Sequence, residues 1–201
     1  CAPGRGQNSA AFRRETRFMH REPLLALIDA YADRHPEDEA LVARFVAFVR
    51  QHERCFERDL WAGHVTGSAW LVNRARDAVL LTHHRKLGRW LQLGGHSDGN
   101  PDALDVARAE AEEESGLVVD PLSLRIFDLD IHEIPARRDD PAHFHFDVRF
   151  AFVVRDSEAF AVSAESLALA WVPIARLSEY TDEESMLRMA RKWRDLAAAA
   201  D

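Results

Sequence analysis

Glutamates crowd into one short stretch near the middle of the chain. The segment EAEEESGL, residues 110–117, contains Glu110, Glu112, Glu113 and Glu114. At about 100° of rotation per helical residue, Glu110, Glu113 and Glu114 share one face, and Glu112 points almost the opposite way. Like charges at this spacing repel one another by roughly 0.2–0.5 kcal/mol per pair. A hard divalent cation, Mg²⁺ or Mn²⁺, would compensate, because both ions take oxygen ligands and bridge carboxylates to phosphate. A solvated acidic face is the alternative.

The residues around the glutamates favour a helix that is anchored on one side. Leu104, Ala107 and Ala111 lie beside the carboxylate face and form an apolar stripe that can pack on a core. We expect the helix to span about residues 102–115, because Gly116 follows and a residue without a Cβ suits a helix C-terminus. The glutamates would then project from one edge of an anchored helix.

A glycine pair precedes this helix, and the whole segment resembles a known family pattern. Residues 95–117 resemble the Nudix box, G-x5-E-x7-R-E-U-x-E-E-x-G-U, in which U is an aliphatic residue. The matching positions are Gly95, Glu110, Glu113, Glu114, Gly116 and Leu117. The flanking segments RWLQLGGH and LALAWVPIARL also resemble the family, so the resemblance extends over about residues 63–180.

The Nudix resemblance implies a fold, an activity and a set of ligands. The implied fold is α/β, of the α+β type, with a mixed β-sheet sandwiched between helices and an N-terminal helical extension. The implied activity is metal-dependent hydrolysis of a nucleoside diphosphate linked to another moiety, with Mg²⁺ or Mn²⁺ as cofactor. Gly95, Glu110, Glu113 and Glu114 would hold the metal, and the three glutamates would be catalytic. One of them, or a loop glutamate such as Glu165, would take the proton from the attacking water.

Two positions depart from the Nudix pattern. Pro101 stands where the pattern has its first glutamate, and Ala109 stands where it has its arginine. Proline suits the first turn of a helix, so we expect Pro101 to begin the helix with Asn100 as its N-cap. Arg108 is rotated by one helical residue away from Glu113, so we do not expect it to replace the missing arginine.

These departures keep two other functions open. One is a Nudix-fold nucleotide-binding or regulatory module with weakened catalysis. The other is an isomerase of isoprenoid diphosphates on the same fold, which in the family uses an active-site cysteine. Cys55 lies outside the region that contains the box, so the isomerase ranks below the other two.

A second group of polar residues alternates along the segment HFHFDVRF. His143, His145, Asp147 and Arg149 fall on one side of the expected strand, opposite Phe and Val residues. We expect the apolar side to face the core and the polar side to face a ligand, with the imidazoles and Arg149 contacting phosphate or a second metal. A solvated strand face is the alternative.

Three further residues are candidates for substrate binding. His96 and His132 would converge on the polar face if the strands pair as they do in Nudix proteins. Hydrogen bonding to phosphate or proton donation is favoured over a histidine metal centre, because histidines far apart in sequence give no metal-ligand spacing. Arg85, with Lys86 and Arg89, could steer a polyphosphate or could lie in a solvated hairpin loop.

The rest of the chain must position these residues. Apolar residues at three- and four-residue steps predict two helices within residues 22–59, split near His35 and Pro36. Short apolar runs predict strands at 66–73, 78–84, 89–95, 123–134, 143–154 and 167–174, followed by a helix at 183–200. We expect a flexible arm at residues 1–18, an N-terminal helical extension at 19–62 and a Nudix-like hydrolase domain at 63–201.

Composition limits the partners. The 201 residues carry a formal net charge of -8, which argues against a broad basic surface for nucleic acid. No apolar run is long enough to span a bilayer, so no membrane partner is expected. Only two cysteines occur, which argues against a disulfide framework and fits a reducing cytoplasm. The expected partner is a small phosphorylated molecule derived from a nucleotide, and a homodimer is a possible assembly.

Overall fold

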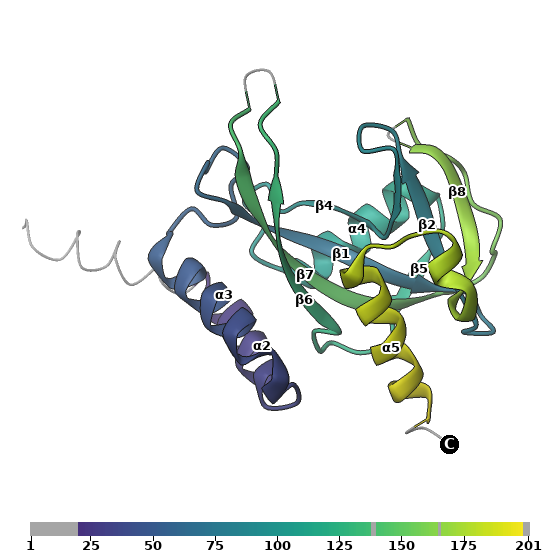
Figure 1. The fold of residues 1–201 in the computed structure, drawn as a ribbon, viewed down its shortest axis with the longest axis horizontal. Coiled ribbons are helices and arrows are strands. Elements are labelled where there is room, and N and C mark those ends of the chain that lie inside the picture. Colours follow the sequence, from purple (N-terminus) through teal and green to yellow (C-terminus); the bar gives the residue numbers. More distant parts are fainter. Residues whose placement is uncertain (1–19, 138–139, 165, 199–201) are drawn as a thin grey trace, which may run out of the picture.

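Residues 20–137, 140–164 and 166–198 are described by a computed structural model of the chain (Figure 1). The arm predicted at residues 1–18 and the candidate base Glu165 lie outside these described residues. None of the helices in the described part of the chain has both the length and the apolar content needed to cross a bilayer.

The strands of the described residues form one mixed eight-stranded sheet. They are β1 (His64–Val72), β2 (Ala78–His84), β3 (Arg89–Leu91), β4 (Leu93–His96), β5 (Val119–Pro121), β6 (Asp128–Ile134), β7 (His143–Val154) and β8 (Ser166–Pro173). Strands β1 and β7 pair in parallel at its centre. The other pairings are antiparallel, with β2 and β4 on β1, β5 and β6 on β7, and β3 and β8 on β2.

Helices cover both faces of this sheet. They are α2 (Glu22–Ala32), η1 (Pro36–Asp38), α3 (Glu39–Gln51), α4 (Ala103–Ser115), η2 (Ile174–Glu179) and α5 (Glu184–Ala198). Figure 1 shows α5 in front of the sheet and α4 behind it. The predicted fold, a mixed sheet between helices with a helical extension at the N-terminal side, is confirmed.

Each face of the sheet carries its own apolar core, because successive side chains of a strand point to opposite faces. In β1, Ala69 and Leu71 enter the core that contains the buried alanines of α4. Trp70 and Val72 enter the other core, which contains Met186 of α5. Two layers of helix are therefore anchored through alternate residues of a single strand.

Helices α2 and α3 extend the core on the α4 side. Phe48 of α3 stacks on Phe146 of β7 with ring centroids 3.7 Å apart, and Phe45 meets the same ring edge-on at 5.3 Å. The predicted split between two N-terminal helices is confirmed, since α2 ends at Ala32 and the next helical turn begins at Pro36. The N-terminal helices α2 and α3 therefore cover part of β7.

Some element boundaries differ from the sequence prediction. The expected strand at 89–95 is interrupted at Gln92, because β3 pairs with β2 whereas β4 pairs with β1. The expected strand at 123–134 begins only at Asp128. Apolar runs predict that a segment is extended, but they do not show where it changes its partner strand.

The start of the glutamate helix also differs. Asp102, not Asn100, is the N-cap, because its carboxylate accepts the N–H groups of Leu104 and Asp105, each at 3.1 Å. The Asn100 side chain instead accepts the N–H of Asp102 at 3.0 Å. Pro101 therefore lies in the turn before the helix and is not its first residue. An aspartate competes well for the cap position, since its charge also favours the helix N-terminus.

Helix α4 lies against the backbone of β1 at Gly67. A Cβ on Gly67 would be 2.8 Å from the carbonyl oxygen of Ala103 and 2.9 Å from the backbone nitrogen of Ala107. Real Cβ contacts are essentially never this short, so a larger residue would push the helix away from the sheet. The glycine sets the distance between α4 and the sheet.

We expect Gly67→Ala to lower the free energy of unfolding by about 1–3 kcal/mol, because the added methyl group overpacks the helix–sheet contact. Urea denaturation followed by circular dichroism measures the change. Gly88→Asn is the control, because Gly88 has φ +64° with no atom within 4 Å of an added Cβ, and asparagine tolerates that conformation. Equal losses in the two variants would contradict the close-contact explanation.

Candidate functional site

Both ends of α4 are fixed by specific residues. The residue at its end is the predicted one, and the residue at its start is close in sequence to the predicted one. Asp102 caps its start, and Gly116 ends it in the left-handed conformation, with φ 69° and its N–H donated to the Glu112 carbonyl at 2.8 Å. Ala107 and Ala111 are buried as predicted. The carboxylate face of the helix is thereby held at the edge of strand β4.

Two of the three candidate glutamates contact the glycine pair of β4. The Glu114 carboxylate is buried and accepts the N–H of Gly94 at 2.9 Å. The Glu110 carboxylate packs directly on Gly95, where a Cβ would overlap it. Glu113 is exposed. Glycine at position 95 therefore leaves room for a carboxylate beside the backbone, which fits a site that binds a cation through oxygen atoms.

The neighbouring helix residues have other partners. Glu112 accepts the N–H of Val119 at 3.3 Å on the side away from the glycine pair, and it is half-buried. Arg108 pairs with Asp105 at 2.5 Å. This pairing agrees with the prediction that Arg108 does not substitute for the arginine missing at Ala109.

The glutamate carboxylates of α4 do not lie close enough together to form a closed metal site. Two groups of three potential ligands have all their donor atoms within 4.8 Å of one another in the described part of the chain, and neither contains a glutamate of α4. A cation that binds beside Gly95 would therefore draw the carboxylates of α4 closer together. Their oxygen-only donor set suits Mg²⁺ and Mn²⁺.

Four of the candidate histidines meet on the sheet face opposite to α4, and a fifth joins them. We call these five residues the histidine cluster: His64, His96, His132, His143 and His145. His64 lies beside His145 in the β1–β7 pair, and His132 lies beside His145 in the β6–β7 pair. The expected convergence of the histidines is thus seen in the structure.

His64 is the member that the sequence analysis did not select. Its ring centroid lies 4.8 Å from that of His145, 4.9 Å from His143 and 5.1 Å from His96. The only local signal for it was its position at the start of a strand, two residues before Thr66. Recognising it required the parallel pairing of β1 with β7, which joins segments about eighty residues apart.

The imidazoles at the centre of the histidine cluster are shielded from solvent, which disfavours their protonation. Burial lowers the pKa of His64 to about 4 and that of His145 to about 2, and the neighbouring imidazoles add to both shifts. Both ring nitrogens of His64 and Nε2 of His145 are buried without a hydrogen-bond partner among the described residues. The Leu60 backbone opposes the shift at His64 but does not reach its ring in hydrogen-bond geometry.

The two outer imidazoles of the cluster do have partners. Nδ1 of His143 lies 2.9 Å from the Pro141 carbonyl oxygen and must donate to it. Nδ1 of His132 lies 3.0 Å from the Asp130 carboxylate. The His132 side chain is 40% exposed, so this edge of the cluster is open to ligands.

Asp147 and Arg149 lie on the same strand face as the histidines but form a buried ionic centre. Arg149 contacts Asp147 at 2.7 Å, Asp128 at 3.2 Å and Asp130 at 3.3 Å, and only 2% of its side chain is exposed. Burial would lower the pKa of Arg149, but the three carboxylates outweigh it and raise the pKa. The guanidinium assigned to phosphate from the sequence therefore pairs with three carboxylates instead.

The carboxylate partners of Arg149 are held from other elements as well. Asp147 accepts the hydroxyl groups of Thr66 and Ser68 at 2.9 and 2.7 Å. Asp128 pairs with Arg188 and Lys192 of α5, each at 2.8 Å. These contacts bind β1, β6, β7 and α5 into one unit.

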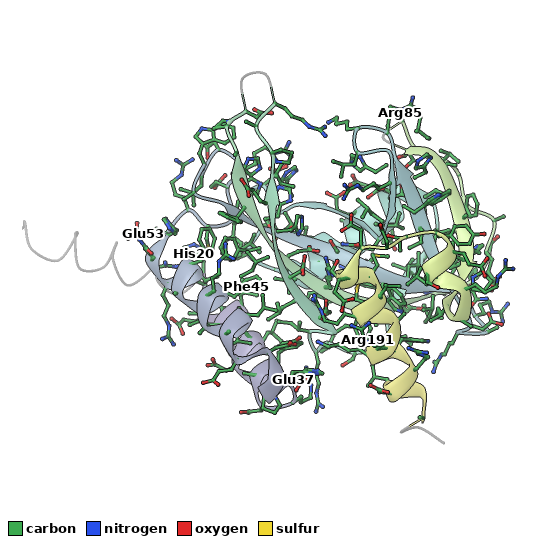
Figure 2. All side chains as sticks on the ribbon, viewed as in Figure 1. His20, Glu37, Phe45, Glu53, Arg85 and Arg191 are labelled. Carbon is green, nitrogen blue, oxygen red and sulfur yellow. The ribbon has the colours of Figure 1, made fainter. Side chains whose placement is uncertain are left out.

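Arg85 lies apart from the histidine cluster. It follows β2, at the upper edge of the molecule in Figure 2, and donates to the backbone carbonyls of Ala164 and Ser166, each at 3.0 Å. The side chain is exposed, so it remains accessible to an anion.

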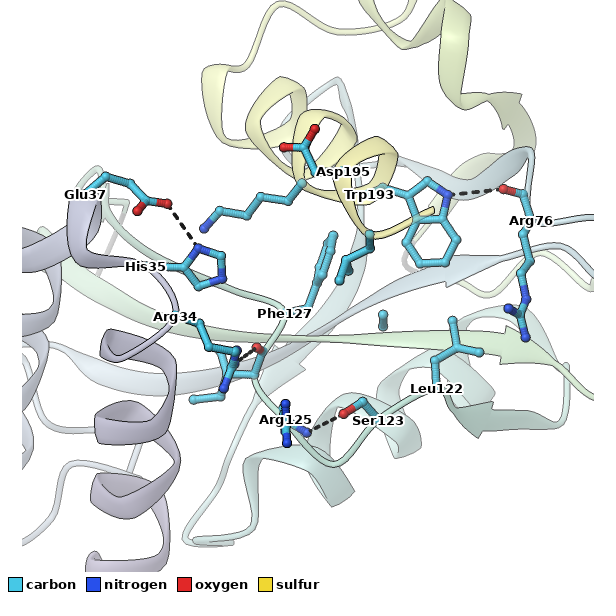
Figure 3. Close-up of a pocket in the computed structure, with 14 residues that line it drawn as sticks. Arg34, His35, Glu37, Arg76, Leu122, Ser123, Arg125, Phe127, Trp193 and Asp195 are labelled. Atoms are coloured by element: carbon cyan, nitrogen blue, oxygen red, sulfur yellow. Dashed lines mark hydrogen bonds and ion pairs between the residues drawn. The ribbon is translucent and has the colours of Figure 1, made fainter. Parts of the chain in front are cut away.

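A cavity of about 630 Å³ lies in another part of the molecule, between the N-terminal helices and α5 (Figure 3). Arg34, Arg76 and Arg125 line it together with the rings of Phe127 and Trp193. None of its lining residues belongs to α4, β4 or the histidine cluster. This cavity is therefore separate from the candidate active site.

The fold and the glutamate helix together define a Nudix protein. The family model of the NUDIX domain matches residues 63–193, so the chain belongs to the NUDIX family. Members of this family are hydrolases that act on nucleoside diphosphate derivatives. No curated protein matches the sequence.

Solved structures with the same fold are distant in sequence. A C. elegans Ap4A hydrolase in a binary complex superposes with a TM-score of 0.51 at 14% identity, over 67% of this chain and 98% of that one. The MutT protein of Methanosarcina mazei Go1 gives 0.53 at 14% identity, over 69% and 97%. The Nudix hydrolase RenU of M. smegmatis gives 0.50 at 17% identity, over 69% and 89%. These similarities establish the fold.

We expect Arg149→Met to destabilise the protein by about 3–5 kcal/mol, because it leaves the buried Asp147 carboxylate without its cationic partner. Urea unfolding at pH 7 measures the loss. Arg176→Met is the matched control, since Arg176 pairs with Glu179 at the exposed surface, and its free energy of unfolding should not change measurably. A small loss for Arg149→Met would show that the carboxylates are neutralised in another way.

The pKa values of His64 and His145 also predict a pH dependence. Both are lowered on folding, so below about pH 6.5 the unfolded chain binds more protons than the folded protein. The free energy of unfolding should therefore fall as the pH drops from about 6.5 to about 4.5. Urea titrations with EDTA across this range test it. His145→Gln should flatten the curve, whereas His83→Gln, outside the cluster, should leave its slope unchanged.

Proposed function

We propose that this NUDIX protein hydrolyses the diphosphate linkage of a nucleoside diphosphate joined to another moiety. The observation that carries the proposal is the set of glutamates held against the Gly94–Gly95 backbone by α4. These groups stand at the matching positions of the Nudix box, within the region that belongs to the family. The three glutamates are the proposed catalytic residues, and Mg²⁺ or Mn²⁺ is the proposed cofactor.

The chain's own groups have distinct parts in this proposal. Glu110, Glu113, Glu114 and the carbonyl of Gly95 would hold the cation, which when bound neutralises the diphosphate and lowers the pKa of a water molecule. The Gly94 N–H holds one oxygen of the Glu114 carboxylate against strand β4. Glu113 is exposed and can accept the proton of the attacking water. Gly95 keeps the space that the Glu110 carboxylate occupies.

The proposed substrate is a small phosphorylated molecule derived from a nucleotide. A chain with a net charge of -8 repels such an anion, so binding needs the cation and a few placed polar groups. His132 at the open edge of the histidine cluster and the exposed Arg85 are the proposed contacts. One solved structure of similar fold is an Ap4A hydrolase of C. elegans, so we include dinucleoside polyphosphates among the substrates to test.

A nucleotide-binding or regulatory module with weak turnover is the second candidate. Pro101 supplies no carboxylate before the helix, and the pairing of Arg108 with Asp105 leaves the role of the arginine unfilled. ADP-ribose, nucleotide sugars, dinucleoside polyphosphates and nucleoside triphosphates should be assayed with Mg²⁺ and with Mn²⁺. Tight binding without phosphate release would favour the module over the hydrolase.

The environment of Cys55 does not support the isomerase alternative. Cys55 is fully buried, and burial raises the pKa of its thiol to about 12. A protonated thiol that is closed off from solvent is a poor catalytic group.

We expect the double substitution Glu113→Gln and Glu114→Gln to lower kcat/KM by about 10²–10⁴-fold, the range for loss of a positioned acid–base group. The glutamine at 114 can still accept the Gly94 N–H, so the fold should survive. Steady-state hydrolysis assays across the substrate panel measure the effect. Glu112→Gln is the control, because Glu112 contacts Val119 away from the glycine pair. Unchanged activity in the double variant would refute the proposed site.

A further inference from the structure

We propose that His64, His96 and His145 form a second metal site, which binds one divalent transition-metal ion of the zinc class. This site is separate from the glutamate site and selects a different kind of ion. Nitrogen ligands favour zinc, cobalt, nickel and copper over magnesium, whereas the carboxylates of α4 favour magnesium and manganese. The inference does not depend on the hydrolase activity.

The three imidazoles come from three neighbouring strands of one sheet. His64 on β1 lies beside His145 on β7, and His96 on β4 lies opposite Thr66, two residues along β1 from His64. A ligand nitrogen from each ring lies within 4.8 Å of the other two. Tetrahedral zinc at about 2.0–2.1 Å from each nitrogen needs separations of roughly 3.4 Å, so small ring rotations would close the site.

The second observation is that two of these rings, those of His64 and His145, have buried nitrogen atoms without partners among the described residues. Both nitrogens of His64 and Nε2 of His145 are buried and make no hydrogen bond among the described residues. Buried polar atoms are almost always paired, and an exception calls for a specific explanation, such as an ion. A metal ion would engage the nitrogens that the protein itself leaves unpaired.

The protonation state of the rings also suits a metal ion. Metals bind neutral imidazole, and a proton on the ring competes with them. Burial and the neighbouring histidines lower the pKa of His64 and His145 well below 7, so both rings are neutral at physiological pH. No proton would have to be displaced from either ring on binding.

The surroundings provide the orientation that metal sites need. The Nδ1 atoms of His132 and His143 bond to Asp130 and to the Pro141 carbonyl, which leaves their Nε2 atoms as acceptors beside the three ligands. A histidine oriented by a carboxylate or a carbonyl is the usual arrangement around zinc. These two rings flank the site and can complete its coordination.

The two metal sites lie on opposite faces of β4. The space beside Gly95 is filled by Glu110 of α4, whereas the ring of the next residue, His96, lies among the histidines. A metal ion at the histidines would therefore hold the strand whose backbone also supports the glutamate site.

The test is a metal titration of protein without a histidine tag, stripped with EDTA and held in excess Mg²⁺ to occupy the carboxylates. Co²⁺ is the probe, because tetrahedral nitrogen coordination gives it visible absorption, and Zn²⁺ is then added in competition. We expect one equivalent of Co²⁺ to bind and Zn²⁺ to displace it. His96→Gln and His145→Gln should each weaken binding by more than the roughly 10–100-fold that loss of an outer partner costs.

Two controls locate the ion. His83→Gln removes a histidine of β2 outside the cluster, and the double variant Glu113→Gln, Glu114→Gln removes carboxylates of the other site. Both should bind Co²⁺ as the unmodified protein does. Circular dichroism checks the fold of each variant, and His96→Gln guards against misfolding of the His145→Gln variant, whose Nε2 atom is buried in the unmodified protein.

Either of two results would overturn the proposal. One is an unchanged Co²⁺ affinity in folded His96→Gln protein. The other is loss of the Co²⁺ signal in the double glutamate variant but not in the histidine variants, which would place the ion at α4.

Discussion

The near-contact between α4 and the glycines of β1 and β4 is the constraint on which the candidate active site depends. Gly67 lets the helix backbone approach the sheet, and Gly94 donates its N–H to Glu114. Gly95 leaves the space that Glu110 fills. Ala107 is buried where the helix meets the sheet and occupies little volume, so the helix backbone can approach the strand. Small residues on both sides thus allow the glutamates to lie on the strand itself.

Much of the fold and the glutamate face could be predicted because their signals are local. Helical rotation alone places Glu110 and Glu113 on one face, and alternation alone separates His145 from Phe146. The environment of Arg149 could not be predicted in this way. Its carboxylate partners on β6 become neighbours only through strand pairing, and a charged residue on an exposed strand has the same local pattern as one in a buried ionic centre.

The start of α4 shows how two reasonable local rules can compete. Asn100 and Asp102 are both good N-caps, and Pro101 suits the first helical turn. In the structure Asp102 is the N-cap, and the Asn100 side chain accepts the Asp102 N–H. The sequence cannot show which of two such neighbouring residues will be the N-cap, because the difference between their capping energies is smaller than the packing energy of the helix that follows. Pro101, which replaces the first glutamate of the Nudix pattern, is consequently part of the turn before the helix. Ala109, which replaces the arginine of the pattern, leaves the site without that side chain.

The chain of charges beneath α5 has a consequence for the modular architecture of the protein. Lys192 binds Asp128 of the sheet at 2.8 Å and Asp38 of the N-terminal extension at 3.0 Å, and Tyr31 donates to the same Asp38. The segment that matches the family begins at residue 63, yet the polar and apolar contacts cross that point. Residue 63 is thus the start of the family match but not a boundary in the packing, and we expect the preceding helices to unfold together with the NUDIX domain.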